Sequence, residues 1–136
     1  MADLIYDSFK EYLGDGTIDL DGHVFKVALL GSGYVPDAGH AGFPDVSSHE
    51  IAGTGYVAGG ATLSGCSWTR NGGTATFDAD DPEWSGATFS ARYAVLYDAS
   101  TAQECLVKLF DFGEDKTVSG GTFLLQFDAL GVLTLS

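Results

Sequence analysis

The sequence predicts a single, mainly β domain: an antiparallel β-sandwich or barrel of about seven to eight strands with one N-terminal helix. Three observations carry this prediction. The chain of 136 residues is long enough for one hydrophobic core and too short for two. Its 19 glycines against three prolines indicate many turns, between segments rich in Thr, Val, Phe and Tyr. The strand-like segments follow one another without the strand–helix–strand rhythm of a parallel sheet.

Residues 1–14 are predicted to form the only helix. Apolar residues recur there at steps of three and four: Ala2, Ile5, Tyr6, Phe9 and Leu13. We expect Asp3 to cap the start of the helix and Gly14 to end it. The apolar stripe must lie against something, and we expect this to be the domain's own sheet, with a neighbouring subunit as the alternative.

Residues 23–30 are apolar at almost every position, which predicts an inner strand covered on both faces. Residues 31–60 are glycine-rich and contain only small apolar islands, which predicts a long loop region. A loop of this length is usually functional or held by contacts, and we expect the variable, partner-facing surface there.

Shorter strands are predicted along the rest of the chain, at residues 61–68, 74–79, 88–97, 104–112, 122–127 and 132–135. We expect a bulge at Gly65 and a hairpin turn at Asn71-Gly72-Gly73. The clearest alternation gives one apolar face, made of Phe89, Ala91, Tyr93, Val95 and Tyr97. That face is predicted to lie in the core.

The charge of the chain excludes several partners. Nineteen Asp and Glu against six Lys and Arg give a formal net charge of −13, which repels phosphate backbones and anionic lipid surfaces. We therefore expect neither nucleic acid nor membrane as a partner. The start MADLIYDSFK lacks the basic and long apolar stretches of a secretory signal, so we expect synthesis in a cytoplasm. Accordingly, Cys66 and Cys105 are expected to be reduced and inert, with a disulfide as the alternative.

Residues suited to chemistry are present without the spacing that a site requires. His23, His40 and His49 lack the close pairing of metal ligands on one element. Two groups of carboxylates could offer oxygens to calcium, but we expect them to form turns: Asp78, Asp80, Asp81 and Glu83, and Asp15, Asp19 and Asp21. Four aromatic residues could build a sugar-binding face, but we expect them to close the core: Trp68, Trp84, Tyr34 and Tyr56.

Neither a Gly-x-Ser-x-Gly nucleophile turn nor a phosphate-binding loop that ends in Gly-Lys-Ser/Thr occurs in the sequence. The residues alone therefore favour a protein that is not an enzyme. We expect no catalytic residues, no cofactor and no metal.

Four stretches together resemble a family of small structural proteins of tailed bacteriophages and prophages. They are KVALLGSGYVPD at residues 26–37, EIAGTGYVAGGATLSG at 50–65, FDADDPEWSGATFSARYAVLYD at 77–98 and DFGEDKTVSGGTFLLQFDALGVLTL at 111–135. The resemblance covers nearly the whole chain. It implies a virion component made in the host bacterial cytoplasm, and a capsid decoration or cement protein on the outside of the head. A tail, head–tail joining or baseplate component is the alternative, and a carbohydrate- or calcium-binding β module is the second.

The expected partners are the major capsid protein or other virion subunits, and further copies of the chain. We expect a symmetric oligomer, with a trimer favoured, because several linked weak contacts hold a small domain on a shell better than one. The predicted interface residues belong to the N-terminal helix and the long loop: Ile5, Tyr6, Phe9, Leu13, Tyr34, Phe43, Ile51 and Tyr56.

Overall fold

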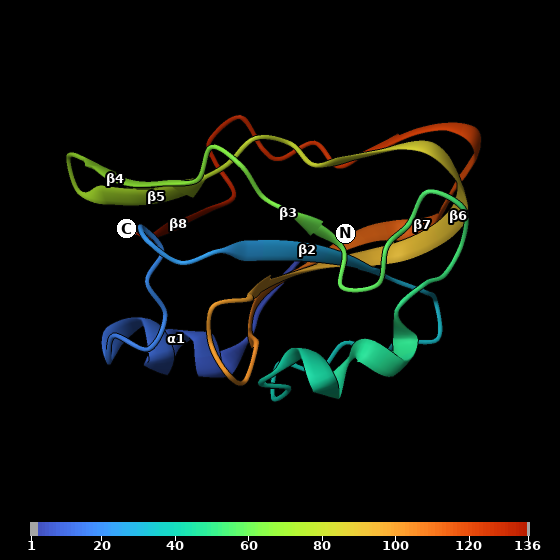
Figure 1. Ribbon diagram of the computed structural model, residues 1–136. Coiled ribbons are helices and arrows are strands. Elements are labelled where there is room, and N and C mark those ends of the chain that lie inside the picture. The colour runs from blue at the N-terminus through green and yellow to red at the C-terminus, as the bar shows by residue number, and fades with distance from the viewer. Residues whose placement is uncertain (1–2, 136) are drawn as a thin grey trace.

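In the computed structural model, residues 3–135 form two antiparallel sheets above a layer of short helices (Figure 1). Met1, Ala2 and Ser136 lie outside the described residues, and with them the expected place of Ala2 in the helix. The elements are β1 (Leu4–Ile5), α1 (Asp7–Gly14), β2 (Phe25–Leu30), the 3-10 helices η1 (Phe43–Asp45) and η2 (Ser47–His49), β3 (Ala61–Thr62), β4 (Ser67–Asn71), β5 (Thr74–Asp78), β6 (Glu83–Asp98), β7 (Cys105–Leu124) and β8 (Leu133–Leu135). The predicted mainly β sandwich with one helix near the N-terminus is confirmed. The barrel alternative is wrong, because the sheets formed by the described residues do not close.

One sheet has the strand order β1-β7-β6-β2-β3 and the other the order β4-β5-β8. The long strands β6 and β7 pair along almost their whole length and curve together from the lower layer into the upper one (Figure 1). This single bent ribbon therefore contributes to both layers of the sandwich. Residues 104–112 and 122–127, predicted as two strands, fall largely within β7, because the chain stays extended around the bend.

A bulge in the ribbon divides its apolar residues between two cores. Ala91 pairs with Lys116, but Tyr93 pairs with Asp111, so extra residues of β7 are accommodated between the two pairs. Phe89 and Ala91 consequently belong to the core between the sheets. Tyr93, Val95 and Tyr97 belong to a second core above the helical layer. The prediction that all five residues share one face is wrong, because a bulge changes the face to which later side chains point.

The N-terminal helix begins later than predicted. Leu4 and Ile5 form strand β1 and pair with Leu109 and Lys108 of β7, so the backbone there is extended. Helix α1 starts at Asp7 without a side-chain cap. The Asp3 carboxylate, the expected cap, instead accepts a hydrogen bond from the backbone N–H of Asp111 at 3.0 Å. Pairing with β7 thus replaces the first helical turn.

The loop region 31–60 is held to the sheets at several points. Isolated bridges join Glu50 to Leu30, Gly42 to Cys105 and Thr54 to Thr88. Thr88 lies in the first half of β6, so the loop covers the edge of that part of the strand. Of the two expectations for this loop, attachment by contacts is confirmed.

The predicted strand 61–68 is divided between the two sheets, which is a correction. Strand β3 pairs with β2 in one sheet, and β4 pairs with β5 in the other. Gly65 lies between them with φ of +65°, so it marks a crossing of the chain rather than a bulge within one strand. The β4–β5 hairpin with its Gly72-Gly73 turn is confirmed.

Candidate functional site

An apolar groove of about 720 Å3 lies where α1 and β1 face β8. We call it the α1 groove, and its main lining residues are Ile5, Phe9, Leu13, Leu133 and Leu135, with Lys10 at the side. Three of the predicted interface residues, Ile5, Phe9 and Leu13, therefore come together here. Phe9 is only 3% exposed and packs into the core between the sheets, whereas Leu135 is 56% exposed. The structure thus leaves a surface hollow with apolar walls beside the helix.

The next two predicted interface residues, Tyr6 and Tyr34, are buried in the second core. Their hydroxyl oxygens lie 3.0 Å apart, and the Tyr34 hydroxyl is 2.9 Å from Nδ1 of His40. Burial raises the pKa of both phenols. The rings of His40 and His49 lie against Tyr34 with centroids 5.7 and 5.6 Å away. Tyr6 and Tyr34 support the surface loop from within, so they are not themselves exposed contacts.

Phe43, Ile51 and Tyr56, the remaining predicted interface residues, also pack inward to different degrees. Phe43 is buried and stacks on Tyr97 at a centroid distance of 4.4 Å. Ile51 and Tyr56 are half-buried against the core between the sheets. The Tyr56 hydroxyl donates to Glu50 at 2.5 Å. Burial, and to a lesser extent this hydrogen bond, raises the pKa of Tyr56. These three residues therefore do not form the exposed contact surface that was expected of the loop.

The aromatic residues considered for sugar binding close the ends of the core. Tyr34 and Trp84 are buried, and Trp68 and Tyr56 are half-buried. The Trp84 ring stacks on Tyr56 at 6.4 Å and meets the edge of Phe123 at 5.9 Å. Their flat faces are used inside the protein, which agrees with the expectation that they pack.

The carboxylates considered for calcium mostly accept hydrogen bonds from nearby turns. Asp19 Oδ1 accepts from the backbone N–H groups of Asp21 and Gly22, at 2.9 and 3.0 Å. Asp81 Oδ1 accepts from the N–H of Phe127 at 2.9 Å. Within residues 3–135, no group of three or more His, Cys, Asp or Glu side chains is arranged to hold a metal ion.

The three histidines do not form one site. His40 and His49 meet around Tyr34, whereas the Nδ1 of His23 lies 2.6 Å from the buried carboxylate of Asp98. Asp98 is the last residue of β6 and accepts a second hydrogen bond from the N–H of Ser100 at 2.9 Å. His23 therefore holds the end of the sheet.

We expect both thiols of the native protein to react slowly with a disulfide reagent. Cys66 and Cys105 are free, Cys105 is buried, and burial raises the pKa of the Cys66 thiol, which lowers its thiolate fraction. Timed labelling should show two thiols that react fully only after unfolding. Mass spectrometry before and after reduction provides the control, since a gain of two hydrogens would reveal a disulfide and contradict the expectation.

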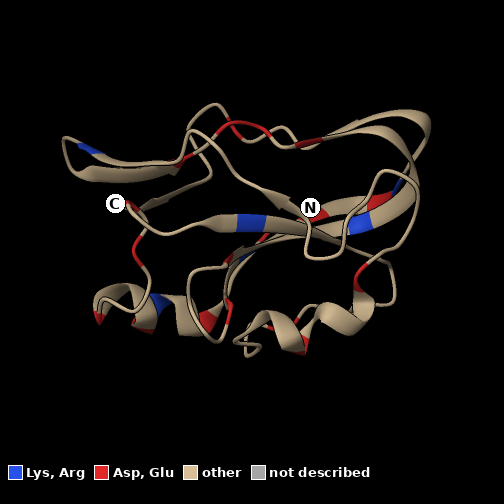
Figure 2. Ribbon diagram, in the orientation of Figure 1, with Lys and Arg blue, Asp and Glu red and all other residues tan. Residues whose placement is uncertain are grey.

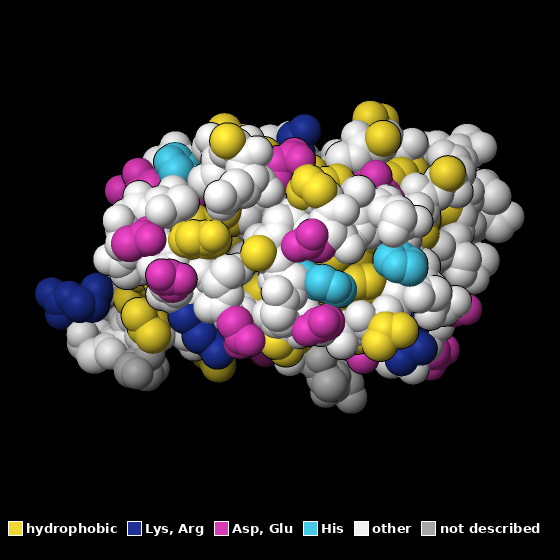
Figure 3. Space-filling model, turned by 90° about the horizontal axis from the view of Figure 1, so that it is seen from below, with side chains coloured by type: hydrophobic (Ala, Val, Ile, Leu, Met, Phe, Trp, Pro, Cys, Tyr) yellow, Lys and Arg dark blue, Asp and Glu magenta, His cyan; other side chains and the backbone are white. Residues whose placement is uncertain are grey.

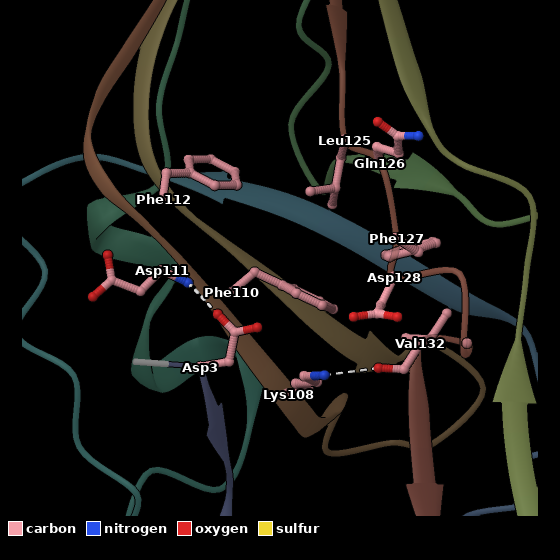
Figure 4. A pocket seen from close by; sticks show the side chains of 11 residues that line it. Asp3, Lys108, Phe110, Asp111, Phe112, Leu125, Gln126, Phe127, Asp128 and Val132 are labelled. Carbon is pink, nitrogen blue, oxygen red and sulfur yellow. Dashed lines mark hydrogen bonds between the residues drawn. The ribbon is translucent and has the colours of Figure 1, made fainter. Parts of the chain in front are cut away.

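No motif in the sequence pointed to Lys108, which lies in a hollow of about 320 Å3 between β7 and the segment 125–132 (Figure 4). We call this the Lys108 hollow. The Lys108 ammonium donates to the backbone oxygen of Val132 at 2.7 Å and lies 4.9 Å from the centre of the Phe110 ring. Burial lowers the pKa of Lys108, while the carboxylates of Asp3 and Asp128 act in the opposite direction. The single charge within the apolar run Leu106–Phe110 was the available signal.

Comparisons with protein-family models, curated proteins and solved structures find no match to this chain. No helix among residues 3–135 is long and apolar enough to cross a membrane.

Proposed function

We propose that this chain is a non-enzymatic structural protein of a tailed-bacteriophage virion, a decoration or cement protein that binds the outside of the head as an oligomer. The observation that carries the proposal is the combination of a strongly acidic surface with an open apolar groove. An acidic exterior disfavours contact with packaged DNA, and apolar hollows favour contact with other protein subunits. The resemblance to phage structural proteins supports the same role.

The distribution of charge supports an outer position. Figure 2 shows Asp and Glu positions in turns, helices and strands, with only a few Lys and Arg positions among them. On the helical face, carboxylates are scattered and apolar side chains occur in small separate groups (Figure 3). Apolar contact is therefore favoured at the α1 groove more than on this face.

The segments that carry the resemblance pack on one another, which supports an architectural role for them. Strand β2 of the first segment pairs with β6 of the third. The Tyr56 hydroxyl of the second segment accepts a hydrogen bond from the N–H of Leu29 at 3.0 Å. Gly55 lies so close to β6 that an added Cβ would be 2.9 Å from Ala87 Cα. Glycines in this motif allow a close approach between backbones.

Binding to capsids tests the proposal directly. Purified protein is mixed with expanded empty heads of the phage that encodes it, and bound protein is measured after sedimentation. We expect saturable binding at a fixed number of copies for each capsomer. Isolated tails serve as the parallel sample, and saturable binding to tails alone would favour the tail or baseplate alternative. Binding to neither, or saturable binding to a glycan or calcium without capsids, would overturn the proposal.

A further inference from the structure

Three hollows lie in succession along the side where the two sheets do not join. The first, of about 400 Å3, is an open hollow along the bent part of β7 and is lined by Phe112, Lys116 and Val118. It shares Phe112 and Leu125 with the Lys108 hollow. The Lys108 hollow in turn shares Asp3 with the α1 groove. We call this continuous band the seam.

The seam is bordered by strand edges that no other described strand covers. From Phe110 to Leu124, β7 pairs only with β6 within the part of the chain that the structure describes. On the other side of the seam, β8 pairs only with β5 within residues 3–135. Figure 4 shows side chains of β7 and of the segment 125–132 pointing toward the same space from opposite sides. The opposite edge of the ribbon differs, since Thr54 bridges to Thr88 of β6 there.

The seam is apolar and electrically balanced on a molecule that is strongly acidic. Its walls include Ile5, Phe110, Phe112, Phe127, Leu133 and Leu135. Three of the six basic residues of the chain line it, Lys10, Lys108 and Lys116, together with three carboxylates, Asp3, Asp111 and Asp128. The charges that line the three hollows therefore cancel, and Glu114 and Asp115 at the bend of β7 are the two further carboxylates on this edge.

We propose that the seam is the surface through which one copy of this chain binds a second copy. Two copies that each carry −13 repel one another over most of their surfaces, and they can approach closely only where the local charge is neutral. A strongly basic partner would instead be attracted to the acidic surfaces outside the seam. The uncovered edge of β7 and the adjoining apolar hollows offer backbone hydrogen bonds and burial to the incoming copy.

This inference takes from the proposed function only the expectation of an oligomer, and it does not depend on a virion. Leu135→Asp tests it by placing a carboxylate at an exposed position of the seam. Val35→Asp, at another exposed apolar residue that lies in the long loop outside the seam, is the matched control. Molar mass by light scattering and sedimentation gives the oligomeric state, and circular dichroism verifies folding.

We expect the wild-type protein and Val35→Asp to form the same oligomer. Leu135→Asp is expected to weaken self-association at least about tenfold, because contact would bury an unpaired carboxylate. Added salt should not dissociate the oligomer, because the hollows of the seam carry no net charge. A wild-type protein that stays monomeric at all concentrations, or a folded Leu135→Asp that associates like the wild type, would overturn the proposal.

Hydrogen exchange provides a second measurement that needs no variant. Backbone amides between Phe110 and Leu124 should exchange more slowly in concentrated than in dilute wild-type protein, and unchanged exchange in an oligomer would place the contact elsewhere and overturn the seam. Failure to bind capsids with an intact oligomer would remove only the virion role. Capsid binding by a protein that never self-associates would remove the seam proposal and the oligomer, and would leave the virion role.

Discussion

Gly60→Ala is expected to lower the free energy of unfolding by at least about 3 kcal/mol. Gly60 has φ of +87°, a conformation that L side chains rarely adopt. An added Cβ would overlap the carbonyl oxygen of Val27 and lie 2.7 Å from Cα of Ala28. Both residues belong to β2, which is paired on both sides and cannot move away without breaking the sheet. Equilibrium denaturation with urea measures the difference.

Gly72→Ala measures the cost of the backbone conformation alone, without the cost of steric overlap. Gly72 also has a positive φ, +60°, but no atom lies within 4 Å of the position of its added Cβ. This variant should cost only about 1 kcal/mol, the conformational part of the effect. Equal losses in the two variants would contradict a steric contribution from β2 to the cost of Gly60→Ala.

Local patterns were sufficient for the elements whose stability depends on nearby residues. The β4–β5 hairpin follows from a turn of two glycines between alternating residues, and the burial of β2 follows from its unbroken apolar run. The bend of β6 and β7 could not be predicted in this way. A bulge is determined by the register between two strands, and residues 88–97 alternate regularly with no local sign that their partner strand carries extra residues.

The same limit applies to the candidate site. The helical periodicity identified Ile5, Phe9 and Leu13, which do line a common groove. It also extended the predicted helix into β1. Periodicity carries no information on the pairing of Leu4 and Ile5 with a strand about a hundred residues away. The Lys108 hollow is assembled from Asp3, β7 and the segment 125–132, so no single window of sequence contains it.

Asp98→Ala is expected to lower the free energy of unfolding by about 3 kcal/mol. Asp98 is the only buried charged residue in the part of the chain that the structure describes, at 0% exposure. Its removal leaves the N–H of Ser100 without its acceptor and the imidazole of His23 without its partner at the end of β6. Asp98→Asn should recover part of the loss, since an amide oxygen can still accept from Ser100. Urea denaturation of the variants provides the comparison.

The chain contains its own control in a second His–Asp pair. His40 Nε2 lies 3.9 Å from Asp37 Oδ2, and the Asp37 side chain is 63% exposed, so solvent screens that pair. Asp37→Ala should therefore cost less than about 1 kcal/mol. Double-mutant cycles with His23→Ala and His40→Ala should give a coupling of about 2 kcal/mol for the buried pair and almost none for the exposed one. A loss in Asp98→Ala no greater than in Asp37→Ala would mean that water reaches the carboxylate of Asp98, and that burial does not make this pair strong.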